Sequence, residues 1–128
     1  MEFDKCASAW IIVRYVDKDA QFKFFPKGSV IEEGRPFDVP GAELTRAHGL
    51  ACAETVIRKY NVTVSEALKL AQIAHEIEIN PWAKHSRDAE KLNRRIVKIM
   101  RKHRDDPAKC LEAGFTVFDE FFRATGDR

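Results

Sequence analysis

The sequence predicts an α+β fold that is mostly helical, with four to five helices packed around a small two-stranded sheet near the N-terminus. Three observations support this fold class. The first 41 residues hold three of the five prolines and three of the six glycines. Two short segments in this region alternate apolar and polar residues, as half-buried strands do. From residue 53 onward, apolar residues instead recur at helical spacing.

The opening segment, residues 5–16, fits either a helix or a strand. Its β-branched residues at positions 11–13 and 16 favour a strand. Asp4 could instead cap a helix whose apolar stripe holds Ala9, Ile12, Val13 and Val16. We favour the helix, followed by a turn over residues 17–20.

The two strands of the predicted sheet come next along the chain. Residues 21–25, Gln-Phe-Lys-Phe-Phe, alternate and end at Pro26. Residues 35–39, Arg-Pro-Phe-Asp-Val, form the expected partner and end at Pro40. The proline within this second segment indicates an edge strand, since proline cannot donate to a neighbouring strand.

Four helices are expected after these strands. In the first, Ala53, Val56, Ile57 and Tyr60 share one face, and Asn61 provides a C-terminal cap. Residues 63–66, Thr-Val-Ser-Glu, match a capping box that begins the second helix. The third helix begins at Ser86, and the fourth at Asp106-Pro107.

The expected core combines the aromatic residues of the first segments with the apolar stripes of the helices. Its predicted members are Trp10, Phe22, Phe24, Leu70, Leu92, Ile96, Phe118 and Phe122. Gly114 interrupts the last helix and is expected to weaken it.

Composition limits the class of protein. With 128 residues, 45% apolar and 33% charged, the chain has the size of one domain, residues 1–128, and enough apolar side chains for a core. The longest apolar run has five residues, and the acidic N-terminus does not resemble a secretory signal. We therefore expect a soluble, cytoplasmic protein without membrane association. The three cysteines lack a Cys-x-x-Cys pattern, which argues against a disulfide scaffold.

Positive charge is concentrated in one segment. The net charge is only +2, yet residues 91–104 hold seven Lys or Arg and no acid. Within the expected helix 86–103, the side chains of Arg94, Lys98, Arg101 and Lys102 follow one another at helical spacing. Such a ridge attracts nucleic acid or a small anion. Alternatively, it is a solvated helix face paired with acids from neighbouring helices.

Two further patterns are candidates for metal binding or acid–base chemistry. His48 and Cys52 stand four residues apart, a spacing at which both could bind one zinc or copper ion. His75 and Glu78 share a helix face and could act as a base and its orienting carboxylate. Together the four residues would form the site of a metal-dependent enzyme. In the alternative, Cys52 is a small buried side chain and His48 lies at a helix start. His75 and Glu78 then form a polar helix edge.

Four segments resemble, in order, the C-terminal domain of chromate resistance protein ChrB. The first, residues 4–24, has Asp4, a Trp six residues later, a basic-aromatic segment, an Asp and then Ala-x-Phe-x-Phe. The others are residues 34–44 with Pro-Phe-Asp-x-Pro-Gly-x-Glu, residues 74–78, and residues 111–119 with Leu-x-x-Gly ending in Asp. Each is short, and their order carries the resemblance.

This chain also departs from the family's pattern. The family often has Cys-Pro before the Trp, where this chain has Ser8-Ala9. A His and a Cys common in the family align with Arg46 and Ala51, whereas this chain has His48 and Cys52 slightly later. The chain looks like the C-terminal domain on its own.

The resemblance implies a regulator or accessory factor linked to chromate resistance. Chromate is a tetrahedral dianion, which Arg, Lys or backbone N–H groups would bind. The Arg residues in the segments that resemble the family are Arg14, Arg35 and Arg46.

We expect a ligand pocket near the start of the chain. Charged groups in apolar surroundings must pair or face a cleft. The expected ligand-binding residues are Asp4, Trp10, Arg14, Asp38, Arg46, His75 and Glu78. In the alternative, Arg14 only bridges carboxylates and so holds the predicted strands against the helices.

The sequence thus predicts a small domain that binds an oxyanion or a metal ion, or otherwise regulates. A metal-dependent enzyme and a nucleic-acid-binding module are the alternatives. The identity of a ligand or cofactor and the oligomeric state do not follow from the residues.

Overall fold

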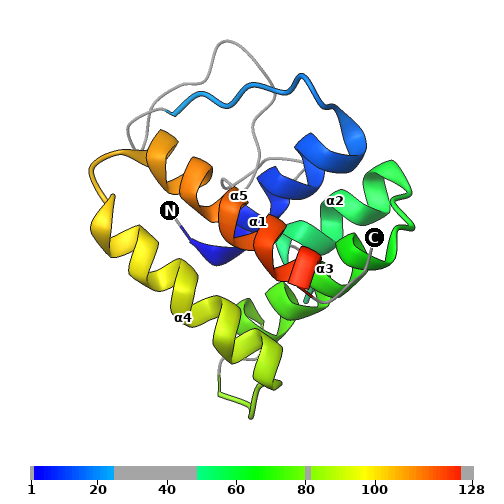
Figure 1. The fold of residues 1–128 in the computed structure, drawn as a ribbon. Coiled ribbons are helices and arrows are strands. Elements are labelled where there is room, and N and C mark those ends of the chain that lie inside the picture. Colours follow the sequence, from blue (N-terminus) through cyan, green and yellow to red (C-terminus); the bar gives the residue numbers. More distant parts are fainter. Residues whose placement is uncertain (1, 25–48, 80–81, 125–128) are drawn as a thin grey trace.

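Helices follow one another along most of the chain that the computed structural model describes, residues 2–24, 49–79 and 82–124 (Figure 1). They are α1 Phe3–Ile11, η1 Ile12–Val16, α2 Cys52–Tyr60, α3 Ser65–Glu78, α4 Arg87–Lys102 and α5 Pro107–Ala124. Helix α1 lies in the middle and packs against α2, α3, α4 and α5. None of the helices described is long and apolar enough to cross a membrane.

The predicted α+β class is wrong, because the fold is all-helical and the described residues contain no strand. Residues 21–24 have no regular secondary structure. Phe22 and Phe24 would share a face of a strand, yet Phe22 packs on the core while Phe24 is 41% exposed. Local alternation therefore did not suffice for a strand. The expected partner, residues 35–39, lies outside the described residues.

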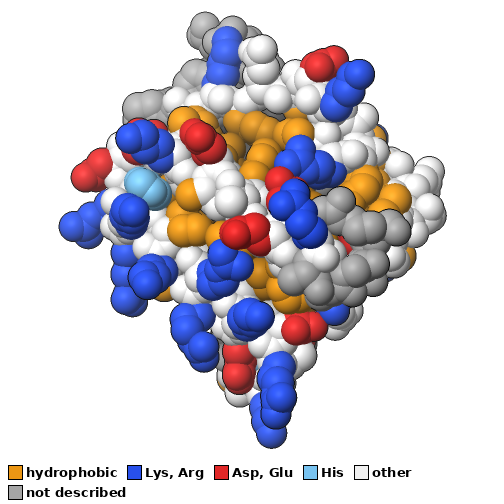
Figure 2. Space-filling view, viewed as in Figure 1, with side chains coloured by type: hydrophobic (Ala, Val, Ile, Leu, Met, Phe, Trp, Pro, Cys, Tyr) orange, Lys and Arg blue, Asp and Glu red, His pale blue; other side chains and the backbone are white. Residues whose placement is uncertain are grey.

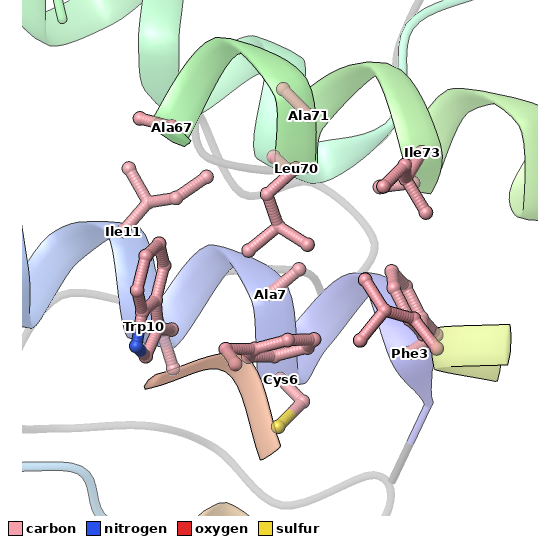
Figure 3. Packing of buried hydrophobic residues seen from close by; sticks show 14 of the residues in the cluster. Phe3, Cys6, Ala7, Trp10, Ile11, Ala67, Leu70, Ala71 and Ile73 are labelled. Atoms are coloured by element: carbon pink, nitrogen blue, oxygen red, sulfur yellow. The ribbon is translucent and has the colours of Figure 1, made fainter. Parts of the chain in front are cut away.

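The opening segment is helical, as we favoured. Eight of the nine residues of α1 are buried, because four other helices surround it. Asp4 is not its cap: Glu2 holds that position, and Asp4 lies in the first turn. Figure 3 shows the apolar side chains of α1 facing those of α3, with Ile11 and Ala7 near Leu70.

Aromatic side chains join α1 to α5. The Phe3 and Phe118 rings meet edge to face at 5.6 Å between centroids. The Trp10 ring stacks on Phe122 at 5.4 Å and meets Phe118 edge to face. Of the predicted core, Trp10 and the members on α3, α4 and α5 are buried, whereas Phe22 is half-buried and Phe24 is exposed.

The helix continues beyond α1 as a wider π-helical turn, η1. The backbone N–H of Asp17 donates to the carbonyl of Ile12, five residues back, at 2.7 Å. This turn carries Arg14 and Tyr15. The Tyr15 hydroxyl donates to Glu66 of α3 at 3.0 Å, so η1 is fastened to a helix that lies far away in sequence.

Local signals located most helix ends correctly. Asn61 adopts a left-handed conformation at φ 51° after α2. The Ser86 hydroxyl accepts the N–H of Ala89, and the Asp106 carboxylate accepts the N–H of Lys109. The capping box at residues 63–66 is wrong, because Val64 is the N-cap of α3 and provides no side-chain bond. Glu66 instead accepts the bond from Tyr15.

Gly114 permits close packing of α5 on α1. A Cβ atom at this position would overlap the Sγ atom of Cys6. The glycine therefore allows the two helices to approach each other, although glycine lowers helix propensity.

Candidate functional site

The outer face of α4 carries a group of exposed cations. Ala89, Leu92 and Ile96 are buried on its inner side. Arg94, Lys98, Arg101 and Lys102 are exposed, and we call these four residues the basic face. Figure 2 shows Lys and Arg side chains gathered along the edge of the molecule where α4 lies.

The two ion pairs that α4 makes within the described residues involve other side chains. Arg95 pairs with Glu120 of α5 at 3.0 Å, and Asp88 pairs with Lys69 of α3 at 3.0 Å. No carboxylate lies within ion-pair distance of the basic face in the part of the chain that the structure describes. Among the described residues these four cations therefore form a solvated helix face, without the acids from neighbouring helices that the alternative interpretation adds.

Two hollows border the basic face. One, of about 400 Å³, is lined by Arg94, Val97, Lys98 and Arg101, without a carboxylate. The other is an open groove of about 690 Å³ between α4 and the ends of α1 and α3. Its apolar surface comes from Phe3, Ile96, Val97 and Met100; its polar lining consists of Glu2, Glu78, Asn93, Arg101 and Arg104. Arg101 thus belongs to both hollows.

Arg14 pairs with a carboxylate that lies 105 residues away in sequence. Its Nη2 atom lies 2.6 Å from Asp119 Oδ2, and its Nε donates to Oδ1 at 3.2 Å. The indole N–H of Trp10 donates to the same Oδ1 at 2.9 Å. Trp10 and Arg14 thus share one acceptor, Asp119. The predicted neighbour Asp38 lies outside the described residues.

The surroundings of Asp119 shift its pKa. Burial by itself would raise the pKa, but hydrogen bonds from Arg14 and Trp10 outweigh burial and lower it below the usual range. The carboxylate is therefore ionised at neutral pH and balances the charge of Arg14. This pair favours a bridging role for Arg14.

Asp4 is fully buried and binds the start of α2. Its Oδ2 accepts the N–H of Cys52 at 2.7 Å, and its Oδ1 accepts the N–H of Ala53 at 2.9 Å. Ala51, the N-cap of α2, has no side-chain acceptor of its own. Asp4 therefore supplies the cap from a distant helix, and the positive end of the helix dipole stabilises its charge.

His75 lies against a carboxylate that the sequence reasoning missed. Its Nδ1 is 2.7 Å from Glu54 Oε1, which also accepts the backbone N–H of Ala51 at 2.9 Å. Glu54 lies on α2, at the capping-box position three residues after the N-cap, and that spacing was the available signal. The predicted partner Glu78 lines the groove beside α4 instead.

The three cysteines of the chain lie in the interior of the fold. Cys6, Cys52 and Cys110 are all buried and free. Burial, and secondarily the proximity of Cys110, raises the pKa of the Cys6 thiol to about 12. The described residues contain no group of three His, Cys, Asp or Glu side chains that could hold a metal ion. His48 and Arg46, which completed the predicted sites, lie outside the described residues.

Comparison with known proteins identifies the family. No curated protein and no solved structure gives a significant match to this chain. The family described as ChrB, C-terminal domain, matches residues 1–125, nearly the whole chain. The predicted resemblance is confirmed: this chain belongs to the ChrB C-terminal domain family and is a chromate-resistance-associated protein.

Proposed function

We propose that this ChrB-type domain is a regulatory accessory protein of chromate resistance that binds the phosphate backbone of a nucleic acid through the basic face of α4. The observation that carries the proposal is the exposure of four cations without a carboxylate partner among the described residues. Unpaired Lys and Arg side chains on one ridge attract phosphate and release counterions on binding.

The dimensions of the basic face suit successive phosphates. From Arg94 to Lys102 the helix rises about 12 Å, at roughly 1.5 Å per residue. Along the axis of a DNA duplex, one strand presents a phosphate about every 3.4 Å, so a face of this length spans about three to four phosphates of one strand. Asn93, next to Arg94, carries the one amide side chain of α4. Since amide side chains often read bases, we expect little sequence preference.

Binding of a fluorescein-labelled 20-base-pair duplex, followed by anisotropy over a series of salt concentrations, tests the proposal. The variant Arg94→Gln/Lys98→Gln/Arg101→Gln should bind more weakly and lose about 2.7 from the slope of log K against log salt, or 0.9 per phosphate contact. The matched control Lys18→Gln/Arg58→Gln/Lys109→Gln removes three exposed cations from other surfaces. Equal weakening by both variants would contradict the proposal, and so would a failure of the unaltered protein to bind both this duplex and one of its separated strands.

A small tetrahedral oxyanion is the second candidate ligand. The hollow lined by Arg94, Lys98 and Arg101 has no acid in its lining, and the family is linked to chromate. Arg14 is already engaged by Asp119, which favours α4 over the Trp10 region for this role. Calorimetric titration with chromate, and with sulfate as a control of similar shape and charge, tests it. Saturable chromate binding that the α4 triple variant abolishes would support this candidate, and unchanged binding in that variant would refute it.

A further inference from the structure

Trp82 is far more exposed than any other large apolar side chain described. Its exposed fraction is 81%, against 37–45% for the other four, which are Phe24, Val64, Leu68 and Val97. The second tryptophan, Trp10, is 2% exposed and hydrogen-bonded. Trp82 therefore contributes little to the core, and its indole faces solvent over most of its surface.

Trp82 lies shortly before the helix that carries the basic face. It lies in the connection between α3 and α4, four residues before Ser86, the N-cap of α4 (Figure 1). Lys84, in the same connection, is exposed as well. Along the chain, this aromatic side chain precedes α4, whose first turn carries Asp88 and Glu90 and whose later turns carry the cations of the basic face.

We infer that Trp82 is a stacking platform for an unpaired base, and that the nucleic acid bound along α4 is single-stranded. The inference rests on the proposed function and specifies its substrate class. Proteins that bind single strands combine cations that follow the backbone with aromatic rings on which bases stack. In a duplex the bases already stack on one another, so an exposed indole gains little from it.

The length of the proposed surface agrees with a single-strand site. Helix α4 has 16 residues and is about 24 Å long. Sites for single strands usually cover about 4–16 nucleotides. A strand of about 12 nucleotides could therefore contact Trp82 and the basic face together.

The experiment compares a 12-nucleotide oligothymidylate with a 12-base-pair duplex in the unaltered protein and in Trp82→Ala. Stacking on Trp82 should quench the exposed tryptophan emission when oligothymidylate is added. Trp82→Ala should weaken oligothymidylate binding about 5- to 150-fold, the range for one base–aromatic stack, and leave duplex binding unchanged. Trp82→Phe, which keeps a ring, should restore most of the affinity. Because Trp82 is exposed, all three proteins should unfold at the same temperature.

The outcomes separate this inference from the function on which it rests. If neither nucleic acid binds, the proposed function fails. If both bind and Trp82→Ala binds oligothymidylate as well as the unaltered protein does, only the inference fails. Vesicles containing phosphatidylserine provide a further arm. A blue shift of the Trp82 emission on these vesicles, without quenching by oligothymidylate, would overturn the inference in favour of a membrane surface.

Discussion

Charged side chains have partners in the helices around α1, whereas those on the outer face of α4 are exposed to solvent. Around α1, Asp4 caps α2, and Arg14 pairs with Asp119. On α4, the four cations of the basic face lack a carboxylate partner within the described part of the chain. Partnered charges hold helices together, whereas unpartnered charges are available to a ligand. The comparison therefore predicts that substitutions near α1 change stability and that substitutions on the basic face change binding.

The largest effect on stability is expected for Asp4→Ala. It removes the carboxylate that accepts the N–H groups of Cys52 and Ala53 in a buried setting. Each unsatisfied buried group costs about 1–3 kcal/mol, so the free energy of unfolding should fall by about 2–6 kcal/mol in denaturant titrations. Asp4→Asn keeps one acceptor and should lose less. A loss under 1 kcal/mol in Asp4→Ala would show that the cap is dispensable.

The next largest effect is expected for Gly114→Ala, which forces a Cβ atom against Cys6. Overpacking of this kind costs about 1–3 kcal/mol. The double variant Cys6→Ala/Gly114→Ala removes the sulfur that the new methyl group meets. Thermal unfolding should then show a smaller loss than the sum of the two single variants. Strict additivity would mean that the two residues are not in contact.

A smaller effect is expected for Arg14→Met. The Arg14–Asp119 pair is partly exposed, with side-chain exposed fractions of 40% and 33%. The loss in the free energy of unfolding should therefore be about 0.5–1 kcal/mol. A loss of about 3–5 kcal/mol would indicate a pair that behaves as if buried.

Acid titration provides the control for this variant. The pKa of Asp119 is lower in the folded state than its ordinary value of 3.8. Its stabilising contribution is therefore complete above the unfolded pKa and disappears as pH falls through the lowered folded pKa. Arg14→Met should show a weaker loss of stability in that acid range. An unchanged acid profile would contradict the electrostatic role of Arg14.

The smallest effect on stability is expected on the basic face. Lys98→Gln and Lys102→Gln break no ion pair among the described residues, so the free energy of unfolding should change by less than about 0.5 kcal/mol. The same two substitutions should weaken duplex binding and lower the salt dependence of binding. If it destabilised the fold while binding persisted, the two regions would not differ as we propose.

Sequence reasoning succeeded where the signal is local. Asn61, Ser86 and Asp106 mark helix ends because each acts on backbone groups within a few residues. The basic face was also found, since the spacing of its cations along one helix is a local property. The two-stranded sheet was wrong because a strand needs a hydrogen-bonded partner, which alternation within residues 21–25 does not guarantee.

The partners of the charged groups could not be derived from spacing. Asp119 lies 105 residues from Arg14, and the N–H groups bound by Asp4 lie 48 and 49 residues from it. Apolar surroundings in the sequence indicated that these charges need partners, but several carboxylates and helix ends were equally available. The packing of α1 against α2 and α5 selects among them.

The hydrogen bond between Asp4 and the start of α2 also closes a loop of the chain. Asp4 and Cys52 are 48 residues apart, and the entropy lost on closing such a loop grows only with the logarithm of the loop length. Doubling the intervening chain would cost about 0.6 kcal/mol, much less than the loss expected for Asp4→Ala. Insertions between α1 and α2 should therefore cost little stability, provided that Asp4 keeps its hydrogen bonds to Cys52 and Ala53.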